Sequence, residues 1–165
     1  MKIVVIGDTH IPKRAKIFPT KLEKDLIHAD LIIHTGDWQT IEVYEELNNL
    51  GNVIGVFGNV DSDELVARLP ERVILPIGDF TLGIIHGHGT KGTTQKRALA
   101  AFSDEKVDCI LFGHSHIPTH TYHNHILLFN PGSPTDKRRQ SHFSYGILDI
   151  TDKIEASHIF FEDKS

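Results

Sequence analysis

The sequence predicts an α/β fold in which two mixed β-sheets pack together and carry helices on their outer faces. Three observations support this prediction. The first two-thirds of the chain alternates short apolar runs, rich in β-branched residues, with segments long enough for a helix. The last third changes to apolar runs separated by tight turns, and no linker or low-complexity segment divides the chain. We therefore expect one domain spanning residues 1–165, a length that buries roughly two-thirds of the unfolded surface.

The apolar pattern and the turn residues locate the individual elements. In the second predicted helix, apolar residues at Ile41, Tyr44 and Leu47 favour an inward face, and Gly51 ends it. Thr20 is expected to cap the first helix, with Glu23 in the capping-box position, and Asp61 or Ser62 to cap the third. The predicted helices are 21–28, 40–50, 63–69 and 92–102, and the predicted strands are 2–6, 31–35, 52–57, 73–75, 80–85, 107–112, 117–123, 125–129, 143–150 and 154–161.

Five apolar runs each end at a side chain that can bind a metal ion, with a glycine directly before or after it. These runs are KIVVIGDTH, LIIHTGD, VIGVFGN, LGIIHGH and CILFGHSH. A lone Asp after Gly is usually a turn or cap residue, and a lone His at a strand end is usually a hydrogen-bonded polar side chain. Five occurrences at the carboxyl end of predicted strands, where α/β proteins build their sites, favour a binding site instead. The candidate ligands are Asp8, His10, Asp37, Asn59, His86, His114 and His116.

The remaining histidines have structural explanations. His34 precedes its strand end and is expected to be a buried, hydrogen-bonded residue. His120, His123 and His125 fall on a predicted hairpin around Asn124 and are expected at the surface.

Composition limits the classes of function. The formal net charge of −5 argues against a protein that binds nucleic acid in bulk, because such proteins carry a basic face. Cys109 is the single cysteine, so no intrachain disulfide is expected, and it is interpreted as a core residue. No apolar run is long enough to cross a membrane or to form a signal-peptide core, so a cytoplasmic location is expected. Twelve histidines in 165 residues agree with a metal site.

The seven candidates are too many for one tetrahedral zinc ion and suit two ions that share a carboxylate. Nitrogen and oxygen donors together suit Mn²⁺, Fe, Zn²⁺ or Ni²⁺ better than Ca²⁺ or Mg²⁺. Two such ions can hold a bridging hydroxide, polarise a phosphoryl oxygen and stabilise an in-line displacement.

The ordered motifs GDTH, GDW, GNVD, HGH and GHSH resemble those of the calcineurin-like metallophosphoesterases. The short chain, the NPGS turn and GNVD resemble the short prokaryotic phosphodiesterase branch. The resemblance implies a four-layer αββα sandwich with a dinuclear centre that hydrolyses a phosphate ester, in first place a phosphodiester, by attack of a metal-bridging hydroxide. It implies two divalent transition-metal ions, Mn²⁺ before Fe, Zn²⁺ or Ni²⁺, and a small substrate such as a nucleotide or cyclic nucleotide. By position, Asp8, His10 and His116 would hold one ion, Asn59, His86 and His114 the other, and Asp37 would bridge them.

One departure from the family pattern concerns proton donation. Larger members place a histidine after the Asn, whereas this chain has Val60. His88 is the available substitute donor, with a pocket-wall role as the alternative. Asp61 is interpreted as a residue that orients a ligand histidine, as a helix cap, or as both. Arg14 and the run 137–139 could reach a substrate phosphate, although solvated surface charge is the favoured interpretation.

The start GDTHIP, with Arg14 and Pro19 after it, also resembles the eukaryotic retromer subunit of the same fold, a trafficking scaffold. The alternative function is therefore a non-catalytic protein-interaction scaffold. That subunit's pattern lacks the bridging Asp and the metal-binding Asn, whereas this chain has Asp37 and Asn59, which favours an enzyme. The sequence leaves the oligomeric state open, a homo-oligomer included.

Overall fold

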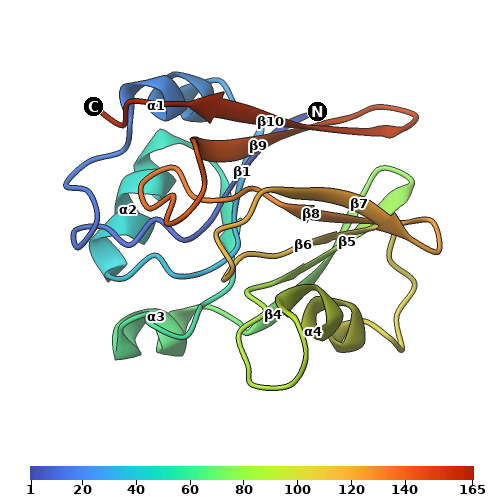
Figure 1. Cartoon of the computed structure of the whole chain (residues 1–165). Coiled ribbons are helices and arrows are strands. Elements are labelled where there is room, and N and C mark those ends of the chain that lie inside the picture. Colours follow the sequence, from blue (N-terminus) through green and yellow to red (C-terminus); the bar gives the residue numbers. More distant parts are fainter.

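The computed structural model describes all 165 residues and has two five-stranded sheets at its centre (Figure 1). The first sheet has the order β10-β9-β1-β2-β3 and the second the order β4-β5-β6-β8-β7. The strands are β1 (Lys2–Ile6), β2 (Leu31–His34), β3 (Val53–Gly55), β4 (Arg72–Ile77), β5 (Phe80–Ile85), β6 (Cys109–Leu111), β7 (Thr119–His123), β8 (Ile126–Asn130), β9 (Phe143–Ile150) and β10 (Ile154–Phe161). The helices are α1 (Thr20–Ile27), α2 (Ile41–Leu50), α3 (Asp63–Arg68) and α4 (Thr94–Ala101).

Both sheets are mixed, as predicted. In the first, β1, β2 and β3 are parallel and β9 pairs antiparallel with β1. In the second, β5, β6 and β8 are parallel, and β4 and β7 are antiparallel at the two edges. The parallel strands of each sheet therefore deliver their carboxyl ends to one edge.

Alternation along the strands separates three apolar cores. Val4 and Ile6 of β1 pack with α1 and α2, whereas Ile3 and Val5 face the second sheet. Ala98 and Phe102 attach α4 to the outer face of the second sheet. The layers are thus helix, sheet, sheet and helix, which confirms the four-layer sandwich (Figure 1).

Several helix boundaries differ from the predictions. Thr20 is the first residue of α1 and Pro19 occupies its N-cap without a side-chain hydrogen bond, so the capping box predicted at Thr20 is wrong. The Ser62 hydroxyl accepts from the Leu65 amide at 3.4 Å, which makes Ser62 and not Asp61 the cap of α3. A further difference is that α4 begins two residues later than predicted, behind the Thr93 cap.

The strand predictions differ mainly in length. β3 and β6 are three residues each, shorter than predicted, because the chain leaves each sheet before its glycine-containing corner. The hairpin of β7 and β8 turns through both Asn124 and His125, whose φ angles of 47° and 70° match a two-residue type I′ turn. The hairpin of β9 and β10 has the predicted bounds. None of the four helices has the length and apolarity that a membrane crossing requires.

Candidate metal centre

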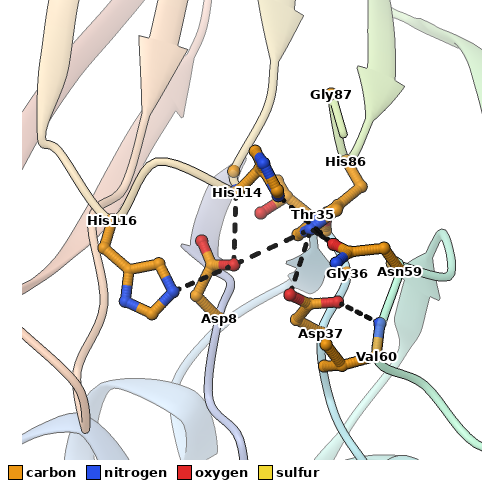
Figure 2. A network of polar contacts seen from close by, with 12 residues as sticks. Asp8, Thr35, Gly36, Asp37, Asn59, Val60, His86, Gly87, His114 and His116 are labelled. Atoms are coloured by element: carbon orange, nitrogen blue, oxygen red, sulfur yellow. Dashed lines mark hydrogen bonds and ion pairs between the residues drawn. The ribbon is translucent and has the colours of Figure 1, made fainter. Parts of the chain in front are cut away.

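The predicted ligands gather where the carboxyl ends of both sheets meet (Figure 2). Asp8 and His10 follow β1 and Asp37 follows β2, whereas His86 follows β5 and the histidines of GHSH follow β6. The sequence pattern predicts only that these ligands follow the carboxyl ends of strands. The structure places the cluster between two sheets, because β5 and β6 belong to the second.

Two groups of three donors form within this cluster. In each group the ligand atoms lie within 4.8 Å of one another. The groups are Asp8, His10 and His116, and Asp37, His86 and His114. Asn59 joins the second group, with its Oδ1 atom 3.1 Å from His86 Nε2 and 3.2 Å from His114 Nδ1.

The two carboxylates link the groups. Asp37 Oδ2 lies 3.2 Å from His86 Nε2 and 3.7 Å from His10 Nε2. Asp8 Oδ1 lies 3.5 Å from His116 Nε2 and 4.0 Å from His86 Nε2. Ligands about 2.1 Å from one ion are separated by roughly 3.0–3.5 Å from each other, so the spacings of 3.2 Å and 3.5 Å are those of a coordination shell.

Hydrogen bonds at Nδ1 orient His86 and His116 so that their unprotonated Nε2 atoms face the cluster. His86 donates its Nδ1 proton to the Thr35 carbonyl at 2.9 Å, and His116 donates its Nδ1 proton to the Asp136 carbonyl at 2.6 Å. In the neutral imidazoles the Nε2 atoms are then acceptors. His86 Nε2 consequently faces the acceptor oxygens of Asp37 and Asn59, an arrangement that needs either an extra proton or a cation.

An unpartnered buried atom supports the same conclusion. Asp8 is fully buried, and its Oδ2 atom has no hydrogen-bond partner. Burying a carboxylate oxygen without a partner is costly unless a cation compensates it. The cluster therefore fits divalent metal ions, with imidazole and carboxylate donors that suit first-row transition metals.

Strained backbone holds the donors in place. Five of the seven candidate ligands have left-handed φ angles, which L side chains adopt at a cost of roughly 1–3 kcal/mol each. They are Asp8 (52°), His10 (45°), Asp37 (59°), His114 (68°) and His116 (61°). Such a concentration of strained residues is typical of a functional site.

Asp61 supports this backbone. Its carboxylate accepts from the amides of Asp37 (3.0 Å), Gln39 (2.7 Å) and Gly58 (2.7 Å). The predicted helix-cap role is wrong, and its partners are backbone amides, not the histidine that was expected. Asp61 fixes the strained turn that presents Asp37.

Burial and mutual charge separate the protonation states of the carboxylates. Burial, reinforced by the charge of Asp37, raises the pKa of Asp8 to about 7. Burial would also raise the pKa of Asp37, but its hydrogen bond to His86 and the charge of His86 outweigh burial and lower that pKa to about 2. Asp37 is thus the permanent anion of the cluster.

The imidazoles are mostly neutral and therefore able to bind metal. Burial lowers the pKa of His114 and of His116 to about 4, and it also lowers that of His10. Burial opposes charge on His86 too, but Asp37 and Asp8 prevail and raise its pKa. His86 is therefore the imidazole that carries a proton when no cation is bound.

The segment after β8 contributes contacts that sequence reasoning missed. The sequence predicts only the NPGS turn here, yet Ser133 donates to the Asp8 carbonyl at 2.8 Å and Thr135 donates to the Thr9 carbonyl. Asp136 supplies the carbonyl that orients His116. The clustered hydroxyls after NPG were the available signal, but their partners are more than a hundred residues away in sequence.

The other histidine predictions can be placed as well. His34 is fully buried, accepts from the Gly36 amide at 3.1 Å and bonds the Thr9 hydroxyl at 3.0 Å, as expected of a structural residue. His120, His123 and His125 are exposed, as predicted. His88 lies beside the cluster, with its ring centroid 5.5 Å from that of His86.

The chain is similar in sequence to two probable metallophosphoesterases of archaea. It is 37% identical over 164 residues to a probable metallophosphoesterase of Methanocaldococcus jannaschii, covering 99% of this chain and 83% of that protein. A probable metallophosphoesterase of Methanothermobacter thermautotrophicus is 34% identical over 139 residues, covering 84% and 80%.

Solved structures share the fold. A zinc-complexed Vps29 from Entamoeba histolytica superposes with a TM-score of 0.77 at 26% identity, covering 97% of this chain and 99% of that one. An archaeal phosphodiesterase superposes with a TM-score of 0.75 at 27% identity, covering 98% and 100%. The model of the calcineurin-like phosphoesterase superfamily domain matches residues 1–153. With these relatives and this cluster of donors, the chain belongs to the calcineurin-like phosphoesterase superfamily.

Proposed function

We propose that the protein is a dinuclear metal-dependent phosphodiesterase. The observation that carries the proposal is the pair of three-donor groups with a carboxylate, Asp37, in reach of both. Asp8, His10 and His116 would hold one ion, and Asn59, His86 and His114 the other. Two Mn²⁺ ions bound there would activate water and polarise the phosphoryl oxygen.

The chain's own residues would orient these groups. The Thr35 and Asp136 carbonyls keep the imidazoles of His86 and His116 in the tautomer that offers Nε2. Asp61 would not contact an ion itself and would act by accepting a hydrogen bond from the backbone amide of Asp37.

A small phosphate ester, for example a nucleotide or cyclic nucleotide, is the proposed substrate. The cytoplasm is the proposed compartment, and residues 1–165 the proposed single domain. The Vps29 neighbours fit the scaffold alternative equally well at the level of fold. The presence of both Asp37 and Asn59 supports the enzyme, because together with the histidines they complete a site for two ions.

The first test is Asp37→Asn. Asparagine has nearly the same shape and can still accept from the Val60 amide, but it removes the permanent anion. Hydrolysis of bis(p-nitrophenyl) phosphate by the Mn²⁺-loaded protein should fall by more than the roughly 100-fold that loss of an outer-shell partner costs. Asp104→Asn, at an exposed site, is the matched control and should leave the rate unchanged.

Two outcomes would contradict the proposal. Greater activity on p-nitrophenyl phosphate than on the diester would replace the phosphodiesterase with a monoesterase. Inactivity of the Mn²⁺-loaded wild type toward both compounds, together with stoichiometric capture of a protein partner, would favour the scaffold.

His88 is the proposed proton donor to the leaving group. Its Nδ1 atom is buried without a hydrogen-bond partner, and Val60, which is 44% exposed, cannot transfer a proton. His88→Gln should slow an alkyl phosphodiester by about 10²-fold or more, because an alkoxide needs protonation. The bis(p-nitrophenyl) ester should change little, since p-nitrophenolate leaves without a proton. Equal losses on both esters would assign His88 to the pocket wall.

A further inference from the structure

A cavity of about 160 Å³ adjoins the candidate metal centre on the side of His10. Its lining is unusually polar, with three cationic side chains, one carboxylate, one amide and a single apolar residue. The lining residues are His10, Lys13, Arg14, Gln39, Val60, Asp136 and Arg138. We refer to this cavity as the Arg138 pocket.

The charged residues of the Arg138 pocket come from two loops that are distant in sequence and held together by hydrogen bonds. The Lys164 ammonium donates to the Arg14 carbonyl at 2.6 Å and to the Thr135 carbonyl at 3.0 Å. Arg14 Nε lies 3.3 Å from Asp136 Oδ2, across the two loops. These contacts keep the cationic groups together before any ligand binds.

The charge of the pocket has the opposite sign to that of the protein. Lys13, Arg14 and Arg138 against Asp136 leave two uncompensated positive charges in the lining, whereas the chain has a formal net charge of −5. The Arg14 side chain is 54% exposed, and only its Nε atom is committed to Asp136. Its remaining donors are free to bind an anion, and a guanidinium matches the oxygens of a phosphate.

The positions of Arg138 and Gln39 indicate that the pocket is part of the substrate site. Arg138 Nη1 donates to the carbonyl of His114 at 3.4 Å, so its guanidinium lies at the rim of the metal centre. Gln39 has a left-handed φ of 103°, and its Oε1 atom is buried without a partner.

We propose that the Arg138 pocket binds a second phosphate group of the substrate, so that the enzyme prefers phosphodiesters that also carry a terminal phosphate. The inference rests on the phosphodiesterase function proposed above. The metal ions would neutralise the phosphate that reacts, which leaves the pocket cations for a different anion. A cavity on the order of 150 Å³ holds a group the size of benzene, so the pocket has room for a phosphate but not for a nucleoside.

The test compares two dinucleotides that differ by one group, ApA and the same compound with a 5′-phosphate, pApA. The wild type should cleave pApA with a kcat/KM higher by about tenfold or more, the effect of one added charge-assisted hydrogen bond. The ratio should fall toward one in Arg14→Ala and Arg138→Ala, and Arg→Lys should restore part of it. Arg139→Ala, an exposed cation next in sequence that does not line the cavity, should keep the ratio of the wild type.

A second measurement needs no catalysis. Titration of the metal-free protein with pApA should shift the Nε–H NMR signals of Arg14 and Arg138 and leave that of Arg139 in place. The pocket proposal fails if those two signals do not move, or if the protein hydrolyses bis(p-nitrophenyl) phosphate but treats ApA and pApA alike. Inactivity toward every diester, with the two NMR shifts present, would instead refute the proposed function and leave the pocket as an anion site.

Discussion

At the scale of one residue, the contacts of His86 show that the site is arranged to bind a cation. Its Nδ1 proton is committed to the Thr35 carbonyl, and its Nε2 atom faces the oxygens of Asp37 and Asn59. Burial opposes a proton on His86, but without a cation the carboxylates of Asp37 and Asp8 favour that proton and raise the pKa of His86. A metal ion would replace that proton.

The pH dependence of metal binding follows from these residues. The pKa of Asp8 is raised to about 7, so below that pH a cation must displace its proton as well as that of His86. Apparent Mn²⁺ affinity should therefore rise with pH, by about tenfold per pH unit for each displaced proton, and level off only once both Asp8 and His86 have lost their protons. An ordinary carboxylate would level off near its usual pKa of about 4.

Calorimetry in two buffers of different ionisation enthalpy measures both the affinity and the protons released. Release of at least one proton at pH 6 is expected. An affinity that stays constant from pH 5.5 to pH 8, with no proton release, would show that Asp8 is already ionised and His86 already neutral in the free protein.

At the scale of elements, the corner after β2 is built around Trp38. The Trp38 ring is fully buried, stacks on His34 with a centroid distance of 3.8 Å and donates from Nε1 to the Val56 carbonyl at 2.8 Å. This packing fixes the turn that carries Asp37. It also explains Gly55 at the end of β3, because the Trp38 ring occupies the space of a Cβ atom there.

Two glycine substitutions test this packing. In Gly55→Ala the new methyl group would collide with the Trp38 ring, so we expect a loss of about 1–3 kcal/mol in the free energy of unfolding. In Gly51→Ala the nearest atom would be Ile32 Cδ1 at 3.7 Å, and this control should unfold like the wild type. Urea unfolding of the two variants measures the difference. Equal stability of both variants would mean that the Trp38 ring moves aside without a loss in the free energy of unfolding.

For the whole molecule, the decisive feature is that the two sheets meet at the ligands. Asp8, His10 and Asp37 belong to loops of the first sheet, whereas His86, His114 and His116 follow strands of the second. Each three-donor group contains residues from both sheets. A bound ion would therefore cross-link the two halves of the sandwich.

Metal loading should accordingly stabilise the folded protein. At a free Mn²⁺ concentration about 100 times Kd, binding adds about 2.7 kcal/mol, which corresponds to a rise in Tm of about 5–10 °C for a chain of this size. EDTA should reverse the rise, and Asp37→Asn should lose most of it. An unchanged Tm in the wild type at saturating Mn²⁺ would contradict a metal centre between the sheets.

Local patterns in the sequence predicted much of this architecture. Apolar runs rich in β-branched residues located β1 and β2, and turn residues located the three hairpins, because these elements depend on neighbouring residues. Helix ends were less accurate. Whether Thr20 or Pro19 caps α1, and whether Asp61 or Ser62 caps α3, depends on competing partners such as the Asp37 amide, which a local pattern does not contain.

The sequence by itself determined the donor types of the site and the strand ends that carry them, because strand, glycine and ligand are adjacent along the chain. Only the tertiary structure decided that the donors come from two sheets, that Asp136 orients His116, and that Arg14 and Arg138 share one cavity. The physical reason is sequence separation. The Arg14 and Arg138 loops are brought together by packing and by Lys164, and no short-range preference of either segment specifies its partner.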